Sequence, residues 1–264
     1  MPVLSIVLPC YNESGNIQAL LARFRPLCTD LDFELILVDN GSTDDTDNVL
    51  RLELLRPENH FARTVLVTKN RGYGHGIQAG LRNCAAPLAA FSHADLQCPP
   101  ESLKTAYQHF IRLCASGNGL VKGRRQGPRP LPDRLVTFFY NGLARLCLGI
   151  GASSIDHDGA TGSCDINAQP KLFARDMIPA LLDGPEDFTF DLYVLWIHRR
   201  LGRPVLEFDT PYEGRVWGKS KLAANPWIRI RTALHAFKKI LSLRLARAEE
   251  LPRDNKFEHP GSGR

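Results

Sequence analysis

The stretch Ala90-Phe91-Ser92-His93-Ala94-Asp95-Leu96-Gln97-Cys98-Pro99-Pro100-Glu101 joins an apolar segment to a polar cluster and two prolines. The apolar run predicts a buried strand, and a helical pattern begins after the prolines. His93, Asp95 and Gln97 are spaced two apart, so in extended backbone their side chains share one face. Ligands of an open α/β sheet bind at the carboxyl ends of its strands. The stretch therefore predicts a site for Mg²⁺ or Mn²⁺, and a polar turn capping the next helix is the alternative.

The surrounding chain alternates between strand and helix patterns. Strands are expected at 3–8, 33–38, 64–68 and 87–92, and helices at 17–27, from about 42, at 74–83 and at 101–115. This alternation predicts an α/β fold with a mostly parallel, Rossmann-like sheet flanked by helices. Further on we expect strands at 120–122 and 204–209, a mobile loop at 123–130, a loop or strand at 159–169, and helices at 134–148, 171–182 and 187–201.

Composition indicates an ordinary globular chain. It has 264 residues, 44% of them hydrophobic and 23% charged, enough for one large domain or a domain with an appendage. No apolar stretch is long enough to span a bilayer, and the N-terminus has no signal-peptide pattern. The seven cysteines are scattered and form no C-x-x-C, which indicates neither a disulfide framework nor a zinc site. A cytoplasmic location is expected.

The C-terminal part of the chain is strongly basic. Residues 215–248 contain no Asp or Glu but nine Lys or Arg, at 215, 219, 221, 229, 231, 238, 239, 244 and 247. Apolar residues recur at helical spacing from Trp227 to Leu245. This pattern is typical either of a helix docked on the domain or of a basic amphipathic helix on the inner face of an anionic membrane. We expect a domain over 1–222, this C-terminal amphipathic helix within 223–250, and a disordered tail at 251–264.

Polar residues follow several of the expected strands. Asp39 ends the second strand, where it could accept a hydrogen bond from a nucleobase or ribose, or cap the following turn. The glycine-rich turn that begins at Gly72 could bring backbone close to a nucleotide, or be a flexible turn. It is a weak dinucleotide-binding signal because it follows the third strand instead of the first. Asp187 and Asp191 lie four apart in the helix expected at 187–201, on one face, although acids there also suit the helix dipole.

Taken together, these motifs resemble glycosyltransferase family 2, the inverting GT-A enzymes, and within it the dolichol- and polyprenyl-phosphate mannosyl- and glucosyltransferases. The resemblance covers roughly residues 3–222. It is carried by Ser5-Ile6-Val7-Leu8-Pro9-Cys10-Tyr11-Asn12-Glu13, Leu37-Val38-Asp39-Asn40-Gly41-Ser42-Thr43-Asp44, Asn70-Arg71-Gly72-Tyr73-Gly74, Ala94-Asp95-Leu96-Gln97, and Arg215 with Gly218, Ser220 and Lys221.

The resemblance implies a nucleotide-diphosphate sugar as donor and Mn²⁺ or Mg²⁺ as cofactor. The residues that it places at the nucleotide are Pro9, Tyr11, Glu13, Asp39, Gly72, Ala94, Asp95 and Lys221. The metal would be held by His93, Asp95 and Gln97. Asp95 and Arg215 would act at the leaving diphosphate, and Ser220 would join the phosphate-binding loop.

The sequence departs from motifs of the family at four points. His93-Ala94-Asp95 stands where D-x-D is usual, which favours Mn²⁺ over Mg²⁺. The usual C-terminal transmembrane hairpin and the Q-x-x-R-W motif of processive synthases are missing from the sequence, and Asp165-Ile166-Asn167-Ala168-Gln169-Pro170-Lys171 replaces the usual S-G-F-R.

The resemblance, together with the basic C-terminal helix, implies an inverting transfer of a hexose from a GDP- or UDP-linked donor to a membrane-associated acceptor such as a polyprenyl phosphate. That acceptor is already ionised and needs only cations, for which Arg124, Arg125, Arg134 and Ser220 are the candidates. A sugar hydroxyl in surface-glycan synthesis is the alternative acceptor, and it would need Asp187 or Asp191 as base. A degenerate nucleotide-sugar binding protein is a further alternative. Nucleotidyl transfer is disfavoured because residues 10–16 lack a Gly-rich loop with Arg and Lys, and no motif indicates a nucleic-acid partner.

Overall fold

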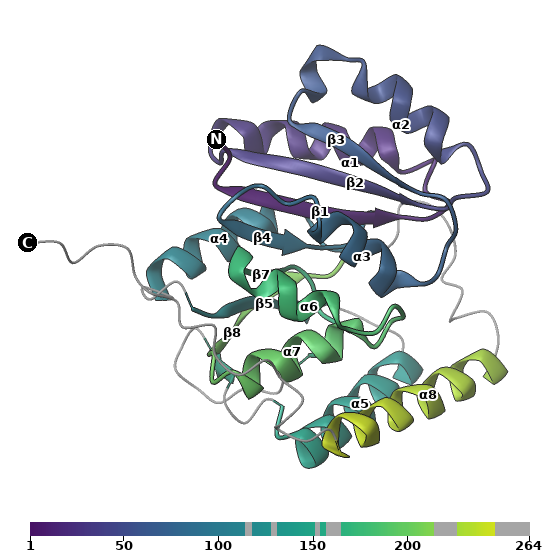
Figure 1. The fold of residues 1–264 in the computed structure, drawn as a ribbon, viewed down its shortest axis with the longest axis vertical. Coiled ribbons are helices and arrows are strands. Elements are labelled where there is room, and N and C mark those ends of the chain that lie inside the picture. The colour runs from purple at the N-terminus through teal and green to yellow at the C-terminus, as the bar shows by residue number, and fades with distance from the viewer. Residues whose placement is uncertain (114–117, 128–130, 151–153, 157–164, 214–225, 246–264) are drawn as a thin grey trace, which may run out of the picture.

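A computed structural model of the chain describes all residues except 114–117, 128–130, 151–153, 157–164, 214–225 and 246–264. The described part is a mixed sheet with helices on both faces (Figure 1). Its strands are β1 (Leu4–Cys10), β2 (Phe33–Asn40), β3 (Ala62–Val67), β4 (Leu88–Phe91), β5 (Leu120–Gln126), β6 (Ser154–Asp156), β7 (Lys171–Ala174) and β8 (Val205–Pro211). The α-helices are α1 (Ile17–Phe24), α2 (Thr46–Leu54), α3 (Tyr73–Leu81), α4 (Glu101–Leu113), α5 (Leu131–Leu148), α6 (Ile178–Leu182), α7 (Phe190–Arg200) and α8 (Pro226–Leu245), with short 3₁₀ turns at η1 (Arg25–Thr29), η2 (Pro57–Asn59) and η3 (Arg175–Met177).

The strand order is β3-β2-β1-β4-β7-β5-β8-β6. Strands β1 to β4 pair in parallel, as do β5 with β8 and β8 with β6, whereas β7 runs antiparallel to both β4 and β5. The predicted α/β class and mostly parallel sheet are therefore confirmed. Because the parallel strands end at one edge, the loops after β1, β2 and β4 lie beside one another there.

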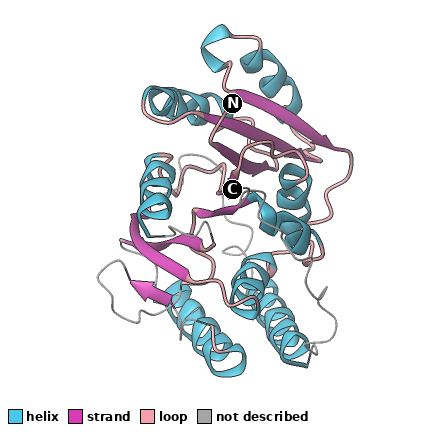
Figure 2. Cartoon of the chain, turned by 60° about the vertical axis from the view of Figure 1, so that its left-hand side comes forward, coloured by secondary structure: helices cyan, strands magenta, loops and turns pink. Residues whose placement is uncertain are grey.

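Successive residues of the central strands enter two different hydrophobic layers. In β2, Leu35 and Leu37 face the core under α1 and α4, while Ile36 and Val38 face the core under α3, α6 and α7. Figure 2 shows helices on both sides of the sheet. Burial on both faces explains why these strands are almost continuously apolar in sequence.

Three local predictions were wrong. Residues 171–182 are not one helix, because β7 occupies Lys171–Ala174 before η3 and α6. Residues 123–126 are not a loop: β5 continues to Gln126, and Gly123 donates its N–H to the Pro170 carbonyl at 2.9 Å. A side chain at Gly123 would stand 2.1 Å from the Gln169 carbonyl oxygen, so this close strand contact needs glycine. Asp187 lies before α7, and so Asp187 and Asp191 do not share a helical face.

The two longest helices, α5 and α8, pack against each other at the end of the molecule away from β3 (Figures 1 and 2). Ala236, Ile240 and Leu243 of α8 are buried in this packing, so α8 is docked on the domain along one side. Within the described ranges, no helix combines the length and apolarity needed to cross a membrane. The predicted tail at 251–264 lies outside the described residues.

Candidate functional site

The loops after β1 and β2 are joined by reciprocal hydrogen bonds. Asn12 donates from Nδ2 to Thr43 Oγ1 at 3.2 Å and accepts the Thr43 backbone N–H at 2.8 Å. The next backbone N–H, of Glu13, donates to Thr46 Oγ1 at 3.0 Å. Asn12 has φ 58°, a left-handed conformation that asparagine tolerates better than most residues. The two loops therefore form one unit, with Pro9, Tyr11 and Glu13 at its β1 side.

Asp39 sits at the end of β2 and is almost fully buried. Its Oδ1 accepts the Ser42 backbone N–H at 2.9 Å, so the capping role considered from the sequence is present. The neighbouring Asn40 donates from Nδ2 to the Gly72 carbonyl at 2.9 Å, which ties β2 to the start of α3. A Cβ at Gly72 would lie 2.4 Å from the Glu186 carbonyl oxygen. Close packing of α3 against residues 185–187 thus gives this glycine a structural role; contact with a nucleotide stays a prediction.

The segment after β4 is bent, contrary to the extended arrangement predicted for His93, Asp95 and Gln97. The strand ends at Phe91, and Leu96 has φ 59°. Asp95 is 4% exposed, and its Oδ1 accepts the Gln97 N–H at 3.1 Å. The bend therefore keeps the Asp95 carboxylate inside the sheet edge.

His93 faces the first residue of α3, because its ring centroid is 5.5 Å from that of Tyr73. Burial lowers the pKa of the His93 imidazole, despite the opposing influence of Asp95 and Asp191. The ring is therefore neutral at physiological pH, the form in which imidazole binds metals.

His93, Asp95 and Gln97 fit a divalent cation, but they supply only part of its ligands. His93 supplies a neutral imidazole, and Asp95 and Gln97 supply oxygen atoms. Among the described residues, no cluster of three or more His, Cys, Asp or Glu side chains is arranged to hold a metal. Mg²⁺ and Mn²⁺ commonly complete their coordination with water and substrate phosphates. The site therefore suits a cation that arrives with, or is completed by, a diphosphate.

A small cavity of about 50 Å³ opens beside His93 and Gln97. Its lining includes Arg125, Asn167 and Gln169. The side-chain oxygens of Asn167 and Gln169 are buried and have no hydrogen-bond partner among the described residues. Buried polar atoms are nearly always satisfied, so these two acceptors indicate a place where a polar ligand or water binds.

Asp191, one of the two predicted bases, lies in a buried ion pair. Its Oδ1 accepts hydrogen bonds from Lys171 Nζ at 2.6 Å and from Gln169 Nε2 at 3.0 Å. The Lys171 side chain is fully buried and that of Asp191 is 5% exposed. Gln169 Nε2 also donates to the Tyr73 hydroxyl at 3.1 Å. Asp191 is therefore linked through Gln169 to the Tyr73 hydroxyl, and the Tyr73 ring lies against that of His93.

Asp187, the other predicted base, is more accessible. Its side chain is 37% exposed and its Oδ2 lies 2.6 Å from Nε2 of His235 on α8. Partial burial by itself raises the pKa of Asp187, but hydrogen bonds from Thr189 and His235 outweigh it and hold the pKa below its usual value. An ionised, accessible carboxylate is better suited to act as a base than the buried Asp191.

The three arginines predicted to bind an acceptor phosphate do not form one cradle. Arg124 donates to Asp209 and Arg125 pairs twice with Asp165, at 2.8 and 2.6 Å, on opposite faces of β5. Arg134 is exposed on α5. Of the three, Arg125 is the one that lines the cavity beside His93.

The chain leading to the predicted phosphate-binding loop is held at the site. The Glu213 N–H donates to the Gln97 carbonyl at 2.9 Å, and Arg23 bridges the Glu213 and Glu101 carboxylates. Arg215, Ser220 and Lys221 themselves lie outside the described residues. Glu213, the last described residue before them, lies beside the Asp95 turn.

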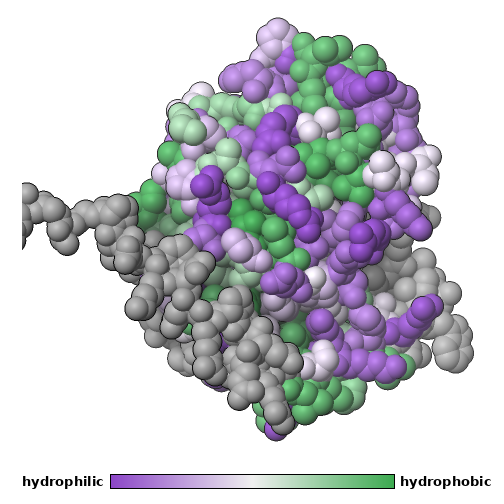
Figure 3. All heavy atoms as spheres, viewed as in Figure 1, coloured by the Kyte–Doolittle hydropathy of each residue, from purple (hydrophilic) through white to green (hydrophobic). Residues whose placement is uncertain are grey.

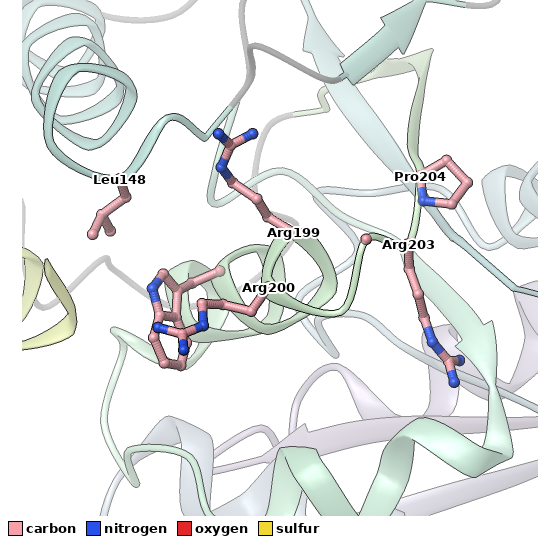
Figure 4. Close-up of a pocket in the computed structure, with 7 residues that line it drawn as sticks. Leu148, Arg199, Arg200, Arg203 and Pro204 are labelled. Carbon is pink, nitrogen blue, oxygen red and sulfur yellow. The ribbon is translucent and has the colours of Figure 1, made fainter. Parts of the chain in front are cut away.

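A larger cavity of about 610 Å³ lies at the far end of α7, and none of the predicted site residues that the structure describes lines it (Figure 4). Arg199, Arg200 and Arg203 are among the residues that line it. Arg203 pairs with Asp176 at 2.7 Å and Arg200 stacks over the Trp196 ring at 5.0 Å. These cations complement the carbonyl end of α7. Of the two cavities, the one beside His93 is the better candidate site, because the polar ends of the strands meet there.

Among the residues of the site that were not predicted from the sequence are Tyr73, Asp165, Gln169 and Lys171. Tyr73 was visible as part of the Asn70–Gly74 motif. The other three lie in the segment that departs from the family pattern, and their partners come from distant elements, so only the folded chain brings them together.

Comparisons with known proteins bear on the function of the site at this edge of the sheet. A family model described as "Glycosyl transferase family 2" matches residues 5–167. A relative from Pseudomonas syringae pv. syringae (strain B728a), an undecaprenyl-phosphate 4-deoxy-4-formamido-L-arabinose transferase, is 35% identical over 196 residues, 71% of this chain and 52% of the relative. A relative with the same description from Photorhabdus laumondii is 27% identical over 220 residues, 83% of this chain and 62% of the relative. The chain thus spans between half and two thirds of these relatives' length.

Solved structures share the fold. Glucosyl-3-phosphoglycerate synthase from Mycobacterium tuberculosis, in complex with Mn²⁺, UDP and glucosyl-3-phosphoglycerate, superposes with a TM-score of 0.65 at 20% identity, covering 92% of this chain and 80% of that one. The same enzyme with Mg²⁺ and UDP gives 0.64 at 20% identity, covering 91% and 80%. At this identity the likeness concerns the fold, and it confirms the predicted GT-A type.

Proposed function

Because the chain belongs to glycosyl transferase family 2, we propose that it transfers a sugar from a nucleotide-diphosphate donor to a polyprenyl phosphate, with inversion at the anomeric carbon. The observation that carries the proposal is the edge where the joined β1 and β2 loops meet the buried Asp95 turn. A UDP-linked donor is favoured because the structural neighbours are described with UDP. The sugar is a hexose, as the sequence predicts, or a 4-deoxy-4-formamido-L-arabinose, as the relatives' description has it.

The leaving diphosphate needs positive charge as its bond to the sugar breaks. A divalent cation bound at this site would neutralise that charge. His93 and Asp95 would hold it, with Gln97 beside them. Arg215 and Lys221, which follow the described residue Glu213 in the chain, would add further positive charge.

The acceptor determines whether the protein must remove a proton. A polyprenyl phosphate has a second pKa near about 6, so it is already anionic and attacks without a base. Arg125, which lines the cavity beside His93, is the described arginine best placed to meet such a phosphate. A lipid acceptor places the chain at a membrane, on the cytoplasmic face.

Transfer of radiolabelled sugar from UDP- and GDP-linked donors to a short polyprenyl phosphate tests the proposal, with Mn²⁺ or Mg²⁺ present. We expect Asp95→Ala to abolish transfer. Asp187→Asn should reduce transfer to a phosphate less than about tenfold, but transfer to a sugar hydroxyl by about 10²- to 10⁴-fold. Asp47→Asn, on the exposed surface of α2, is the control. Nucleotide binding without turnover on any acceptor would instead indicate a binding protein.

A further inference from the structure

The exposed apolar residues of this chain are concentrated on two helices. Among the described residues, ten of the sixteen exposed large hydrophobic side chains lie on α5 and α8. They are Leu131, Leu135, Val136, Phe138, Phe139 and Leu146 on α5, and Leu234, Phe237, Leu241 and Leu245 on α8. In Figure 3 hydrophobic atoms reach the lower edge of the molecule, where Figure 1 places this helix pair.

On α8 the exposed residues form a second stripe, separate from the one that packs on the domain. Leu234, Phe237, Leu241 and Leu245 are spaced three or four apart and so line one side of the helix. Ala236, Ile240 and Leu243, which are buried, line the opposite side. A helix docked only on its own domain needs one apolar stripe, so the second one needs another partner.

The exposed stripe of α5 has the same form. Leu131, Leu135, Phe138 and Leu146 recur on one side of the helix, and Phe139 lies at its border. Phe138 is 70% exposed and Leu146 is 81% exposed. Ala144, on the other side, is fully buried. Because α5 and α8 pack against each other, the exposed stripes of both helices lie at the same end of the molecule.

Basic residues border the apolar stripes. Lys238 and Arg231 follow one side of the α8 stripe and Arg244 the other, and all three are exposed. Residues 226–245 contain five Lys or Arg and no Asp or Glu. An apolar stripe with basic borders is the pattern of a helix lying in the headgroup region of an anionic bilayer.

We propose that the outer stripes of α5 and α8 form a surface that docks on anionic lipid, with the apolar side chains inserted and the basic residues at the headgroups. A second copy of the chain fits less well, because symmetric pairing through α8 would bring its cations together without acids to neutralise them. The surface also adjoins the site, since His235 of α8 contacts Asp187. The proposal rests on the proposed function and deepens it, because a lipid acceptor requires the chain to work at a membrane.

Flotation of the full chain with vesicles tests the proposal. We expect binding to phosphatidylcholine vesicles that contain phosphatidylglycerol, and weak binding to phosphatidylcholine alone. Phe138→Gln/Phe139→Gln should lower partitioning by at least about tenfold, because two large apolar side chains no longer insert. The matched control, Leu55→Gln/Leu66→Gln, changes two exposed leucines, one directly after α2 and one on β3, and should bind like the parent.

Arg231→Glu/Lys238→Glu is a second variant that leaves the apolar stripe intact, and it should abolish the preference for phosphatidylglycerol. Parent-like vesicle binding by both surface variants would overturn the proposal, as would a parent that ignores anionic vesicles. Self-association of the parent that Phe138→Gln/Phe139→Gln abolishes would assign the surface to a second copy instead. No donor or acceptor is present in the flotation, so its failure is distinguishable from a failure of sugar transfer.

Discussion

The buried pair of Lys171 and Asp191 allows a sharp test of the structure. The Nζ–Oδ1 distance is 2.6 Å, and the side chains are 0% and 5% exposed. Lys171→Met removes the cation and leaves the Asp191 carboxylate buried without its counter-charge. Such a loss costs about 3–5 kcal/mol, which corresponds to a fall in Tm of about 6–20 °C for a domain of this size.

The double variant Lys171→Met/Asp191→Leu removes both charges and should recover at least about 2 kcal/mol relative to Lys171→Met. Urea and thermal unfolding of the parent, both single variants and the double variant measure this coupling. Lys104→Met is the control, because the Lys104–Asp30 pair has the same 2.6 Å separation but side chains 37% and 53% exposed. It should cost at most about 1 kcal/mol. Equal losses in Lys171→Met and Lys104→Met, or no recovery in the double variant, would refute the assignment.

Three further outcomes follow from single positions. Burial lowers the pKa of His198 from 6.5 to about 4. The unfolded chain therefore binds more protons between these values, so unfolding free energy should fall by about 3 kcal/mol as pH drops through this window, and less in His198→Gln. Gly80→Ala should cost about 1–3 kcal/mol in urea unfolding because its Cβ would stand 2.2 Å from a β1 side chain, whereas Gly142→Ala, with no atom within 4 Å, should gain about 0.5–1 kcal/mol. His93→Asp should move the metal-dependent thermal shift by UDP toward Mg²⁺ and keep transfer activity, since carboxylate is a harder ligand than imidazole; an unchanged metal preference would remove His93 from the metal site.

Strands β1, β2 and β4 could be predicted from the sequence because they are buried along almost their whole length and read as continuous apolar runs. Their ends could be predicted for the same reason, and Asp39 and Asp95 do lie at the carboxyl edge of the sheet. The bend after β4 could not, since it depends on the positive φ of Leu96, a residue with no turn preference.

Predictions failed where polar residues lie inside the fold. The polar start of β7 gave no strand signal, because a fully buried lysine is rare without a partner. That partner, Asp191, comes from a helix later in the chain. Likewise, the sequence around Arg124 and Arg125 predicts a mobile basic loop. In the folded chain both residues lie in β5, where Asp209 and Asp165 pair with their charges.

The register of β7 also decides how variants of Asp191 must be interpreted. Lys171 lies directly opposite Lys122 of β5, and both are fully buried. Like charges in opposite positions destabilise a sheet, so each lysine needs its own carboxylate: Lys122 pairs with Glu207 at 2.5 Å, and Lys171 with Asp191. Removing Asp191 alone leaves two buried lysines with one acid, which weakens the pairing of β7 that holds Gln169 at the site. Loss of activity in Asp191→Asn would therefore not identify a base. An active Lys171→Met/Asp191→Leu variant would show that Asp191 acts through the fold, because that variant has no carboxylate at position 191 and no unpaired charge.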